Sequence, residues 1–492
     1  MDKLNILLAA SEVVPFAKSG GLADVSGALP KALKELGHDI RVVMPRYYVV
    51  DKAKYGLKLL EGALSVHMGS MGEMFCGVYE GRLPQSDVPI YFIEHDAFFG
   101  RKGLYDEDGE GYDDNDNRFI FFSKAVMQLA KKLHFHPDVI HANDWHTAPI
   151  PMLLNTTYAF DENFKNTGAL LSIHNLEHQG KFYKGAMDVL GIGWEHFRAD
   201  ELEEYDGLNL LKGGIVHADA INAVSKKYAQ EIRTAEFGFG LENLININAD
   251  KLFGILNGVD YDEWSPSIDS LIPHNFDADS LEGKALCKQE LQKRFKLPQN
   301  PNIPLIGLVG RLAEQKGITL IASVLEMVLE MDIQIVLLGT GEKWAESFFS
   351  EKAAKYPEKF AVYIGYDNAI AHQIEAGSDM FLMPSLFEPC GLNQIYSLRY
   401  GTLPIVRATG GLDDTIENYD AYHKSGTGFK FYDPTPSALR DTIGWAVDVY
   451  YNDKEGFSQL IQNAMHKRYE WSKAAVGYEE LYRHIVQGRK NH

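Results

Sequence analysis

The sequence predicts an α/β protein made of two doubly wound units, each a parallel sheet with helices on its faces. Short apolar runs alternate with amphipathic segments along the chain, which is the pattern of buried parallel strands joined by helices. The alternation restarts near the middle of the chain, after a stretch that breaks both periodicities. A chain of 492 residues is also longer than one ordinary hydrophobic core can accommodate, which favours two large domains.

The expected strands fall into two series. NILLAA provides the first strand, and IRVVMP, VPIYFIEH, DVIHAND, ALLSIHN and AINAVS follow in the first unit. PLIGLVG, IQIVLLG, FAVYIGY, DMFLMPS and LPIVRAT form the second series, separated by helices such as ITLIASVLEMVLE. Each series therefore predicts one parallel sheet.

The domain boundary is expected in GILNGVDYDEWSPSID, where Asn-Gly, Ser-Pro and acidic residues interrupt the pattern between residues 254 and 268. This gives a first domain at 1–256 and a second at 257–470. The last segment, 471–492, is predicted as a helix with aromatic residues on one face. Periodicity does not say on which unit this helix packs.

Composition excludes several classes of partner. The net charge of -20 repels nucleic acid and anionic membranes, whereas a neutral polymer is not repelled. A small anion can bind only where local lysine or arginine overrides the overall field. Isolated basic residues in glycine-rich loops are therefore informative.

Cysteine usage and apolar runs indicate the compartment. The 3 cysteines include no C-x-x-C, which predicts reduced thiols and neither a disulfide framework nor a structural zinc site. The apolar run near the amino terminus is too short for a signal sequence, and no later stretch is long enough to span a bilayer. A cytoplasmic location is expected.

Cations follow the first strand of each unit. Lys18 lies beside Gly20 and Gly21 in KSGGLADVSG, which lacks both the G-x-G-x-x-G and the G-x-x-x-x-G-K-[ST] patterns. Arg311 and Lys316 occupy the equivalent loop, VGRLAEQKG, in the second unit. In so acidic a chain this coincidence favours a diphosphate ligand, because guanidinium offers paired donors and ammonium a point charge. The alternative is that these are solvated residues at helix starts.

The stretch MPSLFEPCGLNQIYSLR is the most informative in the second unit. Glu388 follows an expected strand, and Cys390 and Gly391 lead into a helix predicted from Leu392 to Arg399. The first amides of such a helix can bind phosphate oxygens, and a glutamate there suits sugar hydroxyls. The alternative is a carboxylate that only caps the helix.

Together these motifs resemble the bacterial glycogen synthases and plant starch synthases. The resemblance is collinear from Leu4 to about Tyr482. It rests on KSGGLADVSGALPKAL, HANDWHTA, SIHNLEHQGKF, VGRLAEQKG, AHQIEAGSDMFLMPSLFEPCGLNQ and GTLPIVRATGGLDDT.

The resemblance implies a glycosyltransferase B-type fold: two Rossmann-like units facing across a cleft, with the last helix returning to the first unit. It implies transfer of glucose from a nucleotide sugar to the non-reducing 4-hydroxyl of an α-1,4-glucan, with retention of configuration and no metal or other cofactor. ADP-glucose is the expected donor and UDP-glucose the alternative. A non-catalytic glucan-binding protein of the same fold is also open, as is the oligomeric state.

The resemblance also implies roles for single residues. Arg311 and Lys316 would neutralise the leaving nucleoside diphosphate, and Glu388 would hold the glucosyl hydroxyls. His174 would lie beside the anomeric centre, with Asp144 as an acid at the same site. The expected substrate-binding residues are Lys18, Gly20, Gly21, Asp24, Asn175, Asn257, Tyr366, Cys390, Gly391, Leu392 and, near the acceptor, Tyr105.

Each role has a structural alternative: His174 ends an apolar strand, where a buried, hydrogen-bonded histidine is the default, and Asp144 could cap the next helix. Tyr396 stands where many B-type transferases carry a second glutamate, and Glu177 and His178 replace a small residue and a tyrosine. The acidic run YDEDGEGYDDNDN does not fit a calcium loop, since Asn117 occupies the position of the bidentate glutamate.

Overall fold

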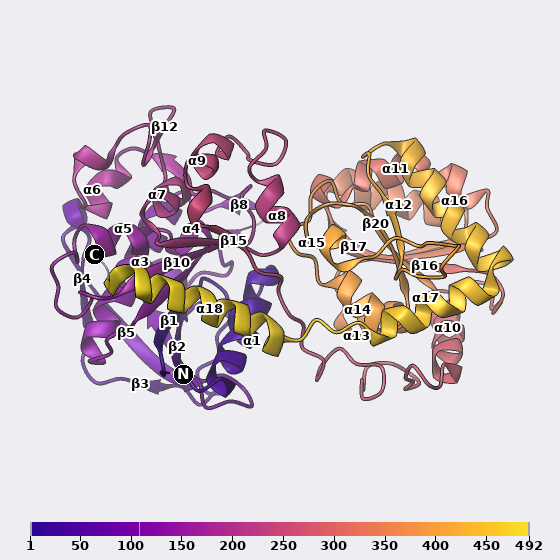
Figure 1. The fold of residues 1–492 in the computed structure, drawn as a ribbon, viewed down its shortest axis with the longest axis horizontal. Coiled ribbons are helices and arrows are strands. Elements are labelled where there is room, and N and C mark those ends of the chain that lie inside the picture. The colour runs from indigo at the N-terminus through magenta and orange to yellow at the C-terminus, as the bar shows by residue number, and fades with distance from the viewer. Residues whose placement is uncertain (1, 108, 491–492) are drawn as a thin grey trace. The chain divides into compact units, whose positions relative to one another are not determined.

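The computed structural model describes residues 2–107 and 109–490, which form two compact units. Unit 1 comprises Met1–Gly258 and Trp471–His492, and unit 2 comprises Val259–Glu470. Within these ranges Met1, Asp108, Asn491 and His492 lie outside the described residues. The chain thus enters unit 2 after Gly258 and returns to unit 1 after Glu470 (Figure 1).

Unit 1 contains a 10-stranded sheet in the order β15-β14-β10-β9-β1-β2-β6-β5-β3, with β4 paired to β5. Its strands from β15 to β6 are parallel, and β5 runs antiparallel to β6, β3 and β4. The bounds are β1 Asn5–Ala9, β2 Asp39–Pro45, β3 Lys58–Leu59, β4 Leu64–His67, β5 Glu73–Arg82, β6 Pro89–Glu94, β9 Val139–Asn143, β10 Gly168–Ile173, β14 Ala220–Ala223 and β15 Leu252–Gly254.

Two small antiparallel sheets complete the strands of unit 1: β7 (Asp106–Glu107) with β8 (Glu110–Gly111), and β11 (Lys181–Tyr183), β13 (Gly207–Asn209) and β12 (Glu203–Glu204). The helices of unit 1 are α1 Gly21–Glu35, α2 Asp96–Phe99, α3 Asn115–Lys132, α4 Asp144–Thr147, α5 Pro149–Asn155, α6 Ala186–Leu190, α7 Leu210–His217, α8 Lys226–Glu231, α9 Glu242–Ile247 and α18 Trp471–Lys490, with the 3-10 turns η1 Gly69–Met71, η2 Trp194–His196 and η3 Ala249–Lys251.

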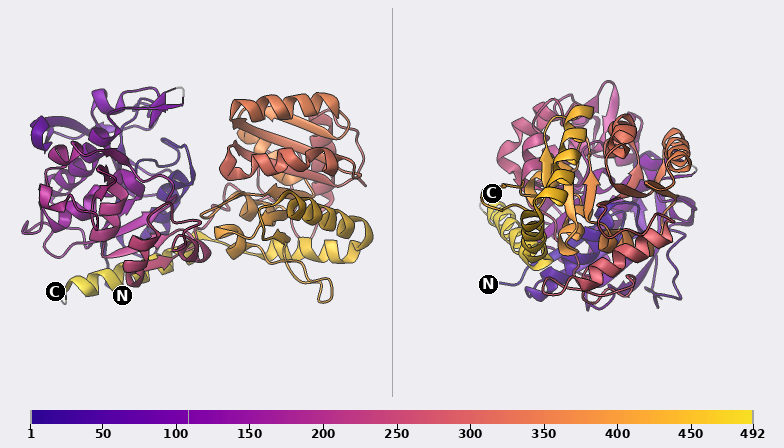
Figure 2. Two further views of the ribbon diagram at one scale, coloured as in Figure 1. Left: turned by 90° about the horizontal axis from the view of Figure 1, so that it is seen from above. Right: turned by 90° about the vertical axis from the view of Figure 1, so that its right-hand side faces the viewer.

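Unit 2 is built on a 6-stranded parallel sheet in the order β18-β17-β16-β19-β20-β21. Helices lie on both sides of its strands (Figure 2). The bounds are β16 Leu305–Leu312, β17 Gln334–Gly341, β18 Phe360–Ile364, β19 Met380–Met383, β20 Leu403–Arg407 and β21 Phe429–Phe431, with helices α10 Glu282–Arg294, α11 Ile318–Leu329, α12 Lys343–Lys355, α13 Asn368–Gly377, α14 Asn393–Arg399, α15 Gly410–Thr415, α16 Pro436–Asn452 and α17 Lys454–His466, and the turn η4 Glu314–Lys316.

The predicted fold class is confirmed: both units are doubly wound, and every predicted strand is present. The sequence did not predict β3 to β5. Both residues of β3 are exposed, and the side chains of β4 and of most of β5 alternate between more and less buried because one face of this antiparallel extension meets solvent. The short strands β7, β8, β11, β12, β13, β15 and β21, at two or three residues each, were also missed because such runs carry no measurable periodicity.

Helix α18 packs on unit 1, where buried hydrogen bonds fix it. The hydroxyl of Tyr482 lies 2.8 Å from Nδ1 of His141 on β9, and Asn222 on β14 donates to the hydroxyl of Tyr478 at 2.9 Å. Nε2 of His141 contacts Ser172 at 2.7 Å. His141, in the middle of β9, is therefore a structural link between sheet and helix.

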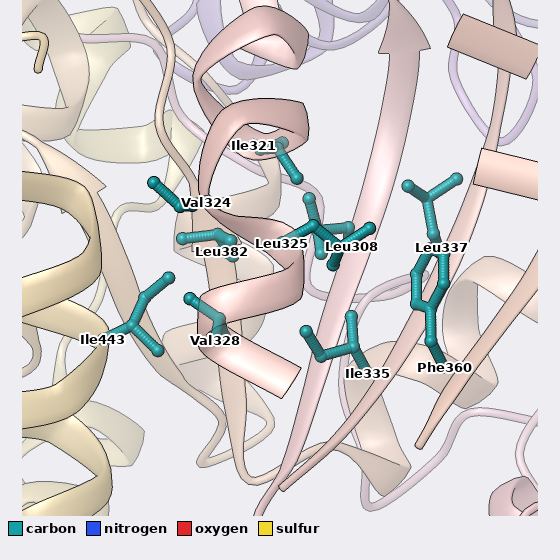
Figure 3. A pocket seen from close by; sticks show the side chains of 10 residues that line it. All are labelled: Leu308, Ile321, Val324, Leu325, Val328, Ile335, Leu337, Phe360, Leu382 and Ile443. Carbon is teal, nitrogen blue, oxygen red and sulfur yellow. The ribbon is translucent and has the colours of Figure 1, made fainter. Parts of the chain in front are cut away.

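Unit 2 contains a small pocket with only hydrocarbon side chains on its walls (Figure 3). Its lining residues come mainly from α11, β16 and β17: Leu308, Ile321, Val324, Leu325, Val328, Ile335, Leu337, Phe360, Leu382 and Ile443. Such a space offers no partner to a charged or polar ligand, so it is a gap in packing.

Among the described residues no helix is both long and apolar enough to cross a membrane.

Candidate active site

Each parallel sheet has one point where the strand order reverses. In unit 1 the chain proceeds from β1 to β2 and β6, and then returns to β9 on the other side of β1. In unit 2 it proceeds from β16 to β17 and β18, and then returns to β19 on the other side of β16. Doubly wound folds bind ligands at the carboxyl ends of the strands at such points. We therefore expect one site beyond β1 and β9 and another beyond β16 and β19.

Glu12 organises the loop beyond β1. This buried carboxylate accepts hydrogen bonds from the amides of Ser19 and Gly20, the latter at 3.2 Å, and from the hydroxyls of Ser19 and Tyr105, both at 2.6 Å. The hydroxyl of Tyr105 also accepts a hydrogen bond from the hydroxyl of Ser11 at 2.7 Å. These hydrogen bonds to Glu12 thus hold the glycine loop at the start of α1 in place.

The same loop has free space beside its two glycines. A Cβ atom built on Gly20 or Gly21 would meet no atom within 4 Å. Lys18 lies beside them and pairs with Asp24 at 2.7 Å, with half of the lysine side chain exposed. Burial raises the pKa of Asp24, and the contact with Lys18 opposes that rise. The loop therefore presents backbone and one ammonium group to a ligand.

Asp144 starts α4 immediately after β9, with a left-handed backbone at φ 54°. Its Oδ1 accepts the amide hydrogen of His174 at 2.6 Å, which joins the end of β9 to the end of β10. Burial raises the pKa of Asp144 to about 7, and the hydrogen bond from the His174 amide opposes the rise. A non-glycine residue at positive φ, with a perturbed carboxyl group at a strand end, is typical of a functional position.

The imidazole of His174 is held in one orientation. Its Nε2 lies 2.9 Å from Oδ1 of Asn143, and the amide nitrogen of Asn143 donates to the carbonyls of Ala9 and His141. Oδ1 must then accept, so Nε2 carries the hydrogen and Nδ1 keeps a lone pair. Because burial lowers the pKa of His174 to about 3, the ring is neutral at pH 7.

His146 lies on α4, as Asp144 does, and its ring contacts that of Tyr105, which donates a hydrogen bond to Glu12. Its ring lies 4.6 Å from that of Tyr105 and 4.1 Å from that of Trp145, measured between centroids. Burial lowers its pKa well below the usual value. Its buried Nδ1 has no hydrogen-bond partner among residues 2–107 and 109–490. The ends of β1, β9 and β10 thus form one polar cluster, the unit 1 cluster.

In unit 2, the ion pair of Lys316 with Glu388 closes the reversal point. Nζ of Lys316, in η4 after β16, lies 2.6 Å from Oε2 of Glu388, which follows β19. Ser385 donates to the same oxygen at 2.9 Å. Glu388 is buried, and the lysine side chain is 26% exposed. The pair leaves one face of the ammonium group open to solvent.

Arg311 lies at the end of β16 with its side chain exposed, and its guanidinium donates to Gln315 at 3.0 Å. Gln315 also binds the loop before Glu388: its carbonyl accepts from the amide of Leu386 at 2.8 Å, and its side chain donates to the carbonyl of Phe387 at 3.3 Å. Arg311, Gln315, Lys316, Ser385 and Glu388 form the unit 2 cluster.

Two glycines support the Glu388 loop from the start of α15. A Cβ atom on Gly410, whose φ is 46°, would lie 1.9 Å from the carbonyl oxygen of Glu388. A Cβ atom on Gly411 would lie 1.9 Å from the carbonyl oxygen of Cys390. Close backbone contact therefore requires glycine at both positions.

The remaining predicted residues have less contact with these clusters. Cys390 is buried, Gly391 has a left-handed φ of 71°, and Leu392 precedes α14, which begins at Asn393. Tyr366 is 71% exposed after β18. In unit 1, Asn257 is buried, and its Oδ1 accepts no hydrogen bond within the described part of the chain.

Comparisons with known proteins agree over nearly the whole chain. Residues 5–247 match the family model for the starch synthase catalytic domain, and residues 289–466 match that for glycosyl transferases group 1. The chain is 55% identical to glycogen synthase 1 of Geobacter metallireducens over 99% of this chain and 97% of the relative. It is 43% identical to glycogen synthase of Moorella thermoacetica over 99% and 98%.

The chain belongs to the glycogen and starch synthase family.

A solved structure of the same family extends the agreement to three dimensions. The catalytic domain of starch synthase IV from Arabidopsis thaliana, bound to ADP and acarbose, superposes with a TM-score of 0.91 at 32% identity and covers 99% of this chain and 100% of that one. Sucrose-phosphate synthase from Thermosynechococcus elongatus shares the fold alone, at 15% identity and a TM-score of 0.60. The protein with this 492-residue sequence is thus an enzyme, a glucosyltransferase with the B-type fold.

Several residues that form or support the unit 1 cluster and the unit 2 cluster were not predicted from the sequence. Asn143, His146, Gly410 and Gly411 lie inside the motifs above but had no predicted role, and Glu12 lies between two of those motifs. Glu12 had one usable signal, a carboxylate three residues after the buried strand β1. The two glycines act by close contact with a distant loop, which no local pattern reveals.

Proposed function

We propose that the chain is a glycogen synthase that transfers glucose from ADP-glucose to the non-reducing 4-hydroxyl of an α-1,4-glucan, with retention of the α configuration. The observation that carries the proposal is the unit 2 cluster, in which Lys316 and Arg311 stand beside the buried Glu388 at the reversal point of the sheet. The ADP and the glucan analogue acarbose bound to the Arabidopsis relative support both ligands.

In this reaction the bond between the glucosyl C1 and the phosphate oxygen breaks, and its electron pair leaves with the diphosphate. Arg311 and Lys316 stabilise the negative charge that develops on the departing ADP. Fixed donors of this kind are worth about a hundredfold to a thousandfold each in rate. Glu388 holds Lys316 in position and accepts hydrogen bonds from glucosyl hydroxyls.

The unit 1 cluster supplies further groups suited to the same reaction. The neutral His174 keeps a lone pair on Nδ1, which suits a centre that gains positive charge at C1 and does not supply a competing cation. Asp144 fixes the backbone of His174 and adds negative charge as it ionises near pH 7. Lys18 and the Gly20-Gly21 loop contact the donor diphosphate, and Tyr105 lies near the acceptor.

The remaining donor contacts follow from the family. Asp24, Asn175 and Asn257 contact the donor sugar and phosphates, Tyr366 lies against the base, and Cys390, Gly391 and Leu392 line the donor loop. The reaction takes place in the cytoplasm and requires no metal. UDP-glucose is the alternative donor.

The deciding experiment incubates the purified protein with glycogen and either ADP-glucose or UDP-glucose. Release of ADP together with longer glucan chains is expected, and β-amylase should digest the extension because it cleaves only α-1,4 links from the non-reducing end. Faster release of UDP would change the donor. Glucan binding without release of either nucleotide would instead identify a non-catalytic glucan-binding protein.

A further inference from the structure

Three side chains that bind metals in many proteins meet in unit 1, outside the residues assigned above. Nδ1 of His196 and Nε2 of His217 each lie 2.5 Å from Oε1 of Glu201. The three ligand atoms are all within 4.8 Å of one another, and this is the one such group of three found among the described residues.

Separate elements fix these side chains before any ligand arrives. His196 closes the turn η2, and His217 is the last residue of α7. Lys212, also on α7, donates to the carbonyls of Ala199, at 2.5 Å, and Glu203, which pins the loop that carries Glu201. The cluster is thus built on a helix and a clamped loop.

The chemistry of the group suits a transition metal. Glu201 is 4% exposed, and a buried carboxylate is costly unless it is paired. Both imidazoles approach the same oxygen, while Nη2 of Arg198 lies 3.6 Å from the other one. Two histidines and one glutamate, with a fourth position for water, form a known zinc donor set. The His196 side chain is 24% exposed, which leaves a route for an ion to enter.

We propose that His196, Glu201 and His217 bind a divalent transition metal ion of the Zn²⁺ class, which fastens the end of α7 to the segment from 196 to 201. Ligand atoms about 2.0–2.1 Å from a tetrahedral ion are about 3.3 Å apart, so the nitrogens need to retreat by roughly 0.8 Å. The ion replaces the hydrogen bonds that now join the group. This revises the expectation of no structural zinc site, which rested on cysteines alone.

The test uses the full-length, tag-free protein after treatment with EDTA and dialysis. Titration with ZnCl2 in a calorimeter is expected to give one equivalent of tight binding, and the thermal midpoint should rise with Zn²⁺. Titration with CoCl2 should give the visible absorption bands of a four-coordinate site. His196→Gln and His217→Gln should each weaken Zn²⁺ binding at least about tenfold.

His423→Gln is the matched control, because His423 also pairs with a carboxylate, Asp420 at 2.7 Å, but in an exposed position without a second histidine. This variant should bind Zn²⁺ like the unmodified protein. Absence of stoichiometric binding by the unmodified protein would overturn the proposal, whether or not the variants fold. Equal binding by folded His196→Gln and His217→Gln proteins, as judged by circular dichroism, would overturn it too.

Discussion

At the scale of single residues, Lys316 is the group on which the proposed reaction depends most directly. Lys316→Ala removes the cation beside Glu388 while the backbone of η4 stays intact, since the lysine side chain is a quarter exposed. Turnover with glycogen and ADP-glucose should fall by about a hundredfold or more. Initial rates of ADP release measure this.

Lys343→Ala is the control for that variant, because it also removes a lysine paired with a glutamate, but one whose side chain is 92% exposed. It should keep the full rate. A Lys316→Ala enzyme as fast as the Lys343→Ala enzyme contradicts the role of Lys316 in diphosphate departure.

Asp144 makes stability depend on pH. Its pKa in the folded protein, about 7, lies above the ordinary aspartate value of 3.8, so the folded state keeps a proton that the unfolded state has lost. The stabilisation is complete below pH 4 and disappears as pH rises through 7. The free energy of unfolding of the unmodified protein should therefore decline relative to that of Asp144→Asn between pH 5 and pH 8 in urea titrations.

Asp87→Asn provides the reference, since the Asp87 side chain is 90% exposed. The difference between this variant and the unmodified protein should stay constant over the same pH interval. An equally flat difference for Asp144→Asn would show that the carboxyl group is not perturbed.

At the scale of elements, glycine has two separate uses in the loops beside the strands. Gly410→Ala forces a Cβ against the Glu388 carbonyl from a left-handed backbone, so it should lower stability by about 1–3 kcal/mol and reduce activity. Thermal melts and ADP release from the same preparation measure both effects.

Gly20→Ala separates the two uses. The new methyl group has free space in the structure and an extended backbone at φ -149°, so the melting temperature should not change. Activity should fall nonetheless, because the methyl group occupies the place proposed for the donor diphosphate. A Gly20→Ala enzyme with an unchanged KM for ADP-glucose argues against contact between this loop and the donor.

Helix α18 has a polar anchor that can be tested by one oxygen atom. Tyr482→Phe removes the hydroxyl at Nδ1 of the buried His141 and leaves that nitrogen without a partner, at a cost of about 1–3 kcal/mol. Chemical denaturation measures the loss. Tyr422→Phe, at a side chain that is 89% exposed, should change stability by less than about 0.5 kcal/mol.

The sequence predicted elements better than it predicted the contacts among them. All eleven strands of the two predicted series are present, because buried parallel strands are continuous apolar runs of the kind that periodicity detects. The pairing of Glu12 with Ser19 is local but invisible in composition, and the Lys316–Glu388 pair joins positions 72 residues apart. Periodicity also gave no account of Tyr396, whose ring stacks 4.0 Å from Trp264 in the interior of unit 2.

At the scale of the whole molecule, unit 1 is discontinuous in sequence, because its last helix follows all of unit 2. A chain that ends after Glu470 lacks the partners of His141 and Asn222 and exposes the apolar surface that α18 covers. We expect such a chain to lose the unfolding transition of unit 1 while that of unit 2 persists. Differential scanning calorimetry of the truncated and full-length proteins compares the two, and a retained unit 1 transition contradicts the expectation.

The late position of α18 has a consequence for biosynthesis. As the ribosome extends the nascent chain, the first two hundred and fifty or so residues emerge without the helix that completes their core, and they wait until the whole second unit has been translated. During that interval the apolar surface of unit 1 that α18 later covers is exposed to other polypeptides. The incomplete unit 1 is therefore expected to be more prone to aggregation during synthesis than after α18 has packed on it.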